Sequence, residues 1–184
     1  MACDATLGRL IPCKDVVGGI KNIYFINDGD AGISITYDSS ETDRIDSIGT
    51  AVDAFKYELA TDGNNFEQSE TTSRETGTSF QTQTLSITLK KLTVADHKEL
   101  KLISYGRPKV IIEDYNQNLF LAGLENGCDV TGGTTVTGSS MGELSGYTLT
   151  LEGKEKIRAN FCDAGGATVA ANLVALGVSV TVGT

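Results

Sequence analysis

Residues 83–91, QTLSITLKK, are the stretch that decides the fold class. Leu85, Ile87 and Leu89 alternate with serine and threonine, and this period of two predicts a β-strand with one buried face. The pattern then changes, because apolar residues recur at helical spacing within residues 93–104, TVADHKELKLIS. An amphipathic strand followed directly by a helix indicates an α+β protein in which a sheet carries much of the core.

The helix has recognisable signals at both ends. Thr93 is a good N-cap residue, and Asp96 stands three positions later, where it completes an approximate capping box. A Gly-Arg-Pro sequence follows the helical pattern and is expected to stop it. We therefore predict a helix from Val94 to about Tyr105, with only moderate amphipathicity.

Strand patterns extend outward from this stretch in both directions. They fall at residues 20–26, 33–37, 55–59, 80–89, 110–112, 119–121, 147–151 and 157–161. Turn-forming residues 27–32 separate the first two strands, and residues 115–118 and 152–154 form similar turns, so each flanking pair is expected to form a hairpin. Seven or eight strands and one convincing helix predict a mainly β fold of the α+β class. We expect an antiparallel β-sandwich or barrel with one flanking α-helix and long inter-strand loops.

Two polar stretches interrupt these strands. Residues 61–79, TDGNNFEQSETTSRETGTS, hold a single aromatic residue, Phe66, and residues 126–146 are dense in Gly, Ser and Thr. Without an apolar period, both are expected to be long loops, which in a compact domain are generally functional or mobile. In an assembly, the first loop should rest on an adjacent subunit, with Phe66 as a candidate inter-subunit contact.

Composition restricts the classes of function. The 184 residues suit one domain, and 24 acidic against 15 basic side chains give a formal net charge of −9. The basic residues are spread along the chain without a cluster, so stable nucleic-acid binding is not expected. The single histidine, His97, leaves few ways to build a general base or a metal site.

The cysteines give no sign of a metal site. Cys3, Cys13, Cys128 and Cys162 form no CxxC pair and have no zinc-ligand spacing. The first residues lack a basic segment followed by an apolar one, so no signal peptide is expected. We therefore expect free, mostly buried cysteines in a reducing compartment.

Short motifs do not assemble into catalytic chemistry. Residues 138–142, GSSMG, match the nucleophile elbow of α/β-hydrolases, but that elbow needs a strand before it, a helix after it and a later histidine. Residues 28–30, DGD, lack the remaining ligands of a calcium loop and are expected to be a turn. We predict that the protein is not an enzyme and that it uses no cofactor and no metal.

The C-terminal residues differ from the rest in charge. Residues 164–184 contain no charged side chain and end in an alternating VSVTV pattern that predicts a strand. Weak apolarity and the lack of a basic flank argue against a membrane anchor. We expect a domain over residues 1–163 and an uncharged extension over residues 164–184. This extension should dock on its own sheet or on a neighbouring subunit, and we favour the neighbour, with Val178, Val180 and Val182 as contact candidates.

From Leu85 onward, the order of elements resembles the tail-tube, or major tail, proteins of bacteriophages. The likeness is carried by the strand 83–91, the helix 93–104, the hairpin 109–127, the Gly/Thr loop 131–147 and the strand 147–156. These segments cover less than half of the chain. The regions on either side match the family only loosely in pattern.

The resemblance implies a non-enzymatic structural protein of the virion tail, assembled in the host cytoplasm. Such proteins are β-sandwiches with a flanking helix that form stacked hexameric rings, contact other tail proteins and take part in genome ejection. Double-stranded DNA would pass through the central channel without specific binding, and no membrane is involved. An acidic channel lets a polyanion slide without capture. Candidates for the lumen-facing side chains are Asp38, Glu41, Asp43 and Asp46.

The uncharged residues 164–184 have no clear counterpart in this family, which leaves alternatives open. A head–tail connector, a terminator or a short-tail ring protein would be a related virion piece. A β-sandwich module that binds host glycans or surface proteins would be a different class of non-enzymatic function. Particle size separates them, because tubes and rings are large oligomers and a binding module is small.

Overall fold

The computed structural model describes residues 8–10, 14–30, 32–59 and 63–183. The elements in chain order are β1 (Ile20–Ile26), β2 (Ile33–Tyr37), β3 (Arg44–Gly49), β4 (Val52–Glu58), β5 (Asn65–Ser73), β6 (Thr78–Lys90), α1 (Val94–Tyr105), β7 (Lys109–Asp114), β8 (Leu119–Ala122), β9 (Asp129–Val136), β10 (Gly146–Glu155), β11 (Asn160–Cys162), α2 (Val169–Ala175) and β12 (Val178–Val182). The protein is mainly β, as predicted, and within the described residues it has two helices and no closed barrel.

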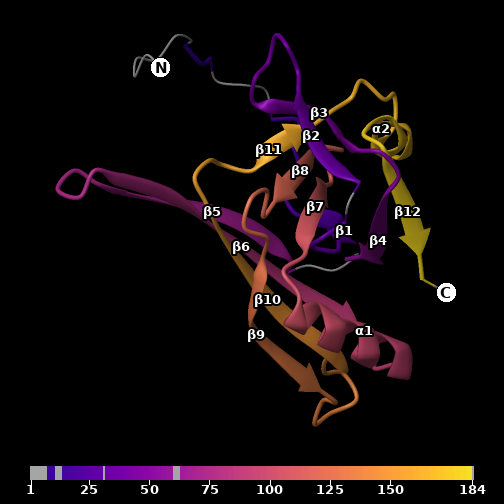
Figure 1. Cartoon of the computed structure of the whole chain (residues 1–184). Helices are drawn as coiled ribbons and strands as arrows, with labels where there is room; N and C mark the ends of the chain where they lie inside the picture. The colour runs from indigo at the N-terminus through magenta and orange to yellow at the C-terminus, as the bar shows by residue number, and fades with distance from the viewer. Residues whose placement is uncertain (1–7, 11–13, 31, 60–62, 184) are drawn as a thin grey trace.

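The strands form two sheets of unequal size (Figure 1). The larger sheet has the order β12-β4-β1-β7-β8-β11-β3-β2, and the smaller one has the order β5-β6-β10-β9. Most neighbours are antiparallel, but β11 pairs with β3 and β12 pairs with β4 in parallel. The two parallel pairs arise because distant parts of the chain return to the same sheet.

The stretch that decided the fold class forms the centre of the smaller sheet. β6 pairs along its length with β10, so that Leu85 lies opposite Leu151 and Ile87 lies opposite Leu149. These side chains are buried in one core cluster with Phe25 of β1, which belongs to the other sheet. The predicted alternation is therefore confirmed, and its apolar face joins the two sheets.

The predicted helix is also confirmed. α1 spans Val94–Tyr105, and the Thr93 hydroxyl accepts the backbone N–H of Asp96 at 3.0 Å. The same hydroxyl donates to the Asp96 carboxylate at 2.6 Å, which completes the cap. Leu100 is buried in the core between the sheets. The chain leaves the helix at Gly106, as the Gly-Arg-Pro signal predicted.

The first expected hairpin is wrong, whereas the hairpin of β7 with β8 is confirmed. β1 does not pair with β2: it lies between β4 and β7, and β2 pairs instead with β3. The reason is burial, because six of the seven side chains of β1 are buried and need apolar neighbours on both faces. The turn-forming residues 27–30 indicate a chain reversal, but they do not indicate which strands will become the neighbours of β1.

Both predicted loops contain edge strands, which is a further correction, although residues 137–145 remain a loop as predicted. Residues 65–73 form β5 and residues 129–136 form β9, and these are the two edges of the smaller sheet. Their outer sides face solvent, so they need no apolar period, and threonine supplies β-propensity. The expected turn at residues 152–154 is also absent, because β10 continues through it to Glu155.

The C-terminal residues 164–183 pack on the larger sheet through α2 and extend it with β12. β12 lies beside β4 in parallel, with Val180 opposite Ala54, and Leu173, Leu176 and Val178 are buried in a second core cluster. Gly177, at φ +84°, makes the tight approach that allows this, since a Cβ there would lie 1.9 Å from the Gly49 carbonyl oxygen. The preference for docking on a neighbouring subunit is therefore wrong for the buried part of this segment.

The two cysteines that the structure describes are free and buried, as expected. Burial raises the pKa of the Cys128 and Cys162 thiols to about 12, so both stay protonated and unreactive at neutral pH. Cys3 and Cys13 lie outside the described residues.

Because Leu176 is fully buried beside β4, Leu176→Ala should lower the free energy of unfolding of the isolated chain by about 2–5 kcal/mol. Val174 lies on the same short helix but is 74% exposed, so Val174→Ala should change stability by less than about 0.5 kcal/mol. Urea unfolding monitored by circular dichroism measures both. Equal, small effects would show that the C-terminal segment does not stabilise the core.

Candidate functional site

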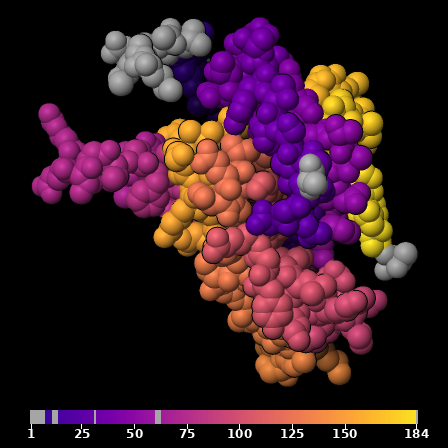
Figure 2. All heavy atoms as spheres, in the orientation of Figure 1, coloured from indigo at the N-terminus to yellow at the C-terminus, as the bar shows by residue number. Residues whose placement is uncertain are grey.

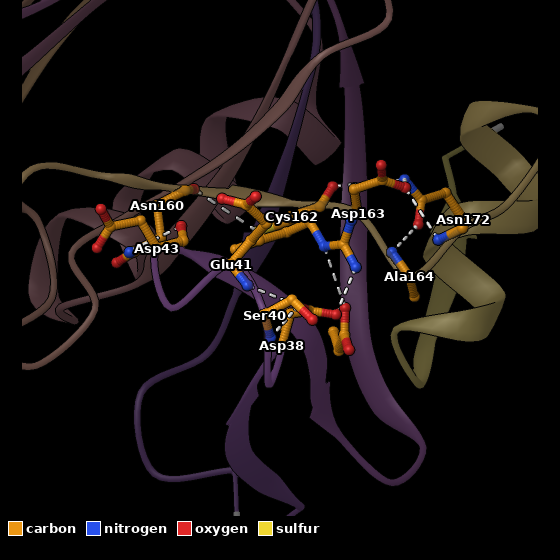
Figure 3. Close-up of polar contacts among 12 residues, drawn as sticks. Asp38, Ser40, Glu41, Asp43, Asn160, Cys162, Asp163, Ala164 and Asn172 are labelled. Atoms are coloured by element: carbon orange, nitrogen blue, oxygen red, sulfur yellow. Dashed lines mark hydrogen bonds and ion pairs between the residues drawn. The ribbon is translucent and has the colours of Figure 1, made fainter. Parts of the chain in front are cut away.

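Three of the four acidic residues predicted to face a channel lie in the turn between β2 and β3, and the fourth follows in β3. We call Asp38, Glu41, Asp43 and Asp46 the acidic turn. Asp38 organises it, because its carboxylate accepts the backbone N–H groups of Ser40 and Glu41, each at 2.7 Å (Figure 3). A carboxylate that receives two backbone donors closes the chain reversal without any apolar contact.

Arg44, the first residue of β3, compensates part of this negative charge. Its guanidinium donates to Asp38 at 2.5 Å, and its Nε lies 3.4 Å from an oxygen of Asp46. The backbone N–H donors and Arg44 together hold the pKa of Asp38 below its ordinary value. Glu41 and Asp43 are exposed and form no ion pair within the described part of the chain, so they carry the free charge.

The base of the acidic turn is tied to the C-terminal part of the chain. The Asn160 amide donates to the backbone oxygen of Asp43 at 3.0 Å, and the backbone N–H of Asp163 donates to Ile45 at 3.0 Å. Asn172 of α2 then donates to Asp163 at 3.2 Å and accepts the backbone N–H of Ala164 at 2.7 Å (Figure 3). Sequence reasoning missed this amide network, because its members are isolated polar residues far apart in the chain.

A second feature is a long hairpin, made of β5 and β6, that projects from the body (Figures 1 and 2). Its base is held by Arg158, which pairs with Glu70 at 2.9 Å, and by Gln68, which accepts the backbone N–H of Ala159 at 2.7 Å. Beyond Glu70, β5 pairs only with β6, from Thr71 opposite Phe80 to Ser73 opposite Thr78. The distal part is thus held by backbone hydrogen bonds without a core of its own.

Phe66 does not lie on this distal part. It packs at the base of the hairpin against the chain's own core, with its ring centroid 6.5 Å from that of Phe120. The apolar side chain that the distal hairpin does present is Phe80, which is 37% exposed. An isolated aromatic residue next to a polar strand segment was the only sequence signal for it.

The three valines of β12 have different surroundings. Val178 is buried, Val180 is half-buried against the second core cluster, and Val182 is 61% exposed. β12 is an edge strand, so one side of its backbone has no neighbouring strand within the described structure. Of the three predicted contact residues, Val182 has the most exposed side chain.

Two motifs considered from the sequence can be compared with the geometry of the described residues. Ser139 donates from its backbone and its hydroxyl to Glu143, at 2.6 and 2.7 Å, and the loop then leads into strand β10, not into the helix that a nucleophile elbow requires. No group of three or more His, Cys, Asp or Glu side chains converges in the described part. Neither described helix has the length and apolarity needed to cross a membrane.

No family model, no curated protein and no solved structure matches this chain. The function is therefore inferred from the surfaces themselves: the acidic turn, the long hairpin and the free strand edges.

The low pKa of Asp38 has a consequence for stability against pH. The folded state favours the ionised form of Asp38, so this carboxylate stabilises the fold at pH values above the ordinary aspartate pKa of about 3.9. The stabilisation is lost as the pH falls through the lower pKa of the folded state. Asp38→Asn should therefore flatten the stability profile below about pH 4. Thermal melts across this range measure it. Glu41→Gln removes the same charge without touching the Asp38 carboxylate and is the matched control; an identical profile in both variants would contradict the role of Asp38.

Proposed function

We propose that the protein is a structural virion protein that assembles with copies of itself into stacked rings, of the kind that forms a bacteriophage tail tube. The observation that carries this proposal is the long hairpin. Its distal strands bury almost nothing against their own chain, and a protruding ribbon of this kind gains stability when another subunit covers it.

Free strand edges support the same proposal. The smaller sheet ends in β5 on one side and β9 on the other, with nine and eight residues. Long unprotected edges invite pairing with another chain, and a sheet with two free edges can be extended by a neighbour on each side. Repetition of that contact would give a continuous wall of strands.

The charge of the protein is compatible with a DNA conduit. A formal net charge of −9 repels phosphate groups, so DNA could move along a channel wall without being held. We propose hexameric rings, by resemblance to the tail-tube family, with acidic side chains outnumbering basic ones on the channel wall. A connector, terminator or short-tail ring protein would use the same edges but would stop at a single ring.

Shortening the hairpin tests the proposal. Residues 71–80 are replaced with Asn-Gly, which joins the paired residues Glu70 and Gln81 through a two-residue turn. The contacts of Gln68 and Glu70 with the body remain in this variant. We expect a cooperative melt close to that of the parent, because the deleted part has no core, together with loss of large oligomers in sedimentation velocity and of tubes in negative-stain images.

Arg74→Ser, at the hairpin tip, keeps the full length and serves as the control. A parent protein that sediments as a single chain at micromolar concentration would contradict self-assembly. Normal tubes from the shortened variant would show that the hairpin is not an assembly element.

A further inference from the structure

One face of α1 is not used by the fold. Val94, Lys98, Lys101, Leu102 and Tyr105 share this face, because positions four, seven, eight and eleven residues after Val94 lie within one side of a helix. The three apolar members are 91%, 54% and 78% exposed in chain order. The opposite side of the helix supplies Leu100 to the core. We call the exposed face the α1 stripe.

The α1 stripe is positively charged. Neither Lys98 nor Lys101 forms an ion pair with any residue that the structure describes. The helix's own acids lie off the stripe, since Asp96 caps the helix with Thr93 and Glu99 lies on another side. A groove of about 410 Å³ borders the stripe between α1 and β9, and its lining includes Lys101 and His97 but no carboxylate.

The acidic turn lies at the other end of the molecule in the view of Figures 1 and 2, where the β2–β3 turn and α1 occupy opposite ends. There Glu41 and Asp43 are exposed and free of ion pairs within the described residues. Within its described residues, each subunit therefore presents two lysines without ion pairs on the α1 stripe at one end, and two carboxylates without ion pairs at the acidic turn at the other. The apolar side chains of the stripe add surface that favours a protein partner over a nucleic acid.

We propose that the α1 stripe binds the acidic turn of a second copy of this chain, in a head-to-tail contact that rests on the self-assembly proposed above. Opposite charges at the two surfaces steer the approach and fix the orientation, and the apolar residues of the stripe are covered on contact. Because the two surfaces differ, the contact is heterologous and repeats from copy to copy, which gives the assembly a direction. In this proposal the acidic turn contacts a neighbouring subunit, whereas the sequence predicts that it lines the channel.

Charge reversal on the two sides tests this contact. Lys98→Glu with Lys101→Glu, or Glu41→Lys with Asp43→Lys, should each raise the protein concentration for half-assembly roughly tenfold or more. The four changes combined in one chain should restore assembly toward the parent value, because both surfaces are then inverted. Sedimentation velocity at low and high salt measures the effect, and the parent should assemble less readily as salt rises.

Lys154→Glu with Lys156→Glu makes the same charge change at exposed lysines away from α1 and is the matched control. If the parent assembles and neither reversal changes its assembly, or if the combined variant is not restored, this contact is wrong and self-assembly stands. If the parent protein itself sediments as a monomer, the proposed self-assembly is wrong, and the contact is wrong with it. Binding of a DNA duplex that Lys98→Glu with Lys101→Glu abolishes, with assembly unchanged, would assign the stripe to nucleic acid and overturn the contact.

Discussion

The burial of β1 on both faces is the constraint on which the rest of the fold depends. Ile23 and Phe25 point into the core between the two sheets, whereas Tyr24 and Ile26 belong to the cluster on the other face. A strand of this kind cannot lie at an edge, so it recruits β4 and β7 as neighbours from distant parts of the chain. The polar side chains of β1 also have hydrogen-bond partners. The Asn22 amide and the Tyr24 hydroxyl each donate to the buried Glu113 carboxylate at 2.7 Å.

The second core cluster explains why the C-terminal segment cannot be separated from the fold. It lies on the face of the larger sheet that the smaller sheet does not cover. There α2 contributes Leu173, and β12 extends the sheet itself with Val178. The backbone N–H of Ile48 donates to Leu176 at 2.9 Å, and that of Val52 donates to Gly177 at 3.0 Å. Burial in the same chain therefore accounts for the uncharged side chains at Asn172, Leu173, Leu176 and Val178.

The parts of the fold that could be predicted are those with a strong local period. β6 can be predicted from the alternation between Leu85 and Leu89, and α1 can be predicted from the Thr93 cap. In both cases the signal lies in residues that are close together in the sequence. β5 and β9 could not be recognised as strands, since edge strands facing water need no alternation. The acidic turn could be located from the sequence as a cluster of carboxylates. Its ion pair with Arg44 and its link to Asn172 could not be predicted, because tertiary contacts have no fixed spacing in the sequence.

The parallel pairing of β12 with β4 also has a consequence for the order of events during synthesis. β4 ends at Glu58, yet the strand that covers its outer edge begins only at Val178, after the elements from β5 to α2 have been made. Translation proceeds from the N-terminus, so the apolar surface around β4 stays open until residues 173–178 have emerged from the ribosome. A prematurely terminated chain lacks Leu173, Leu176 and Val178 and leaves that apolar face uncovered. Apolar surface that stays exposed during synthesis is prone to aggregation, so the late arrival of residues 173–178 is the stage at which folding of this sheet is most vulnerable.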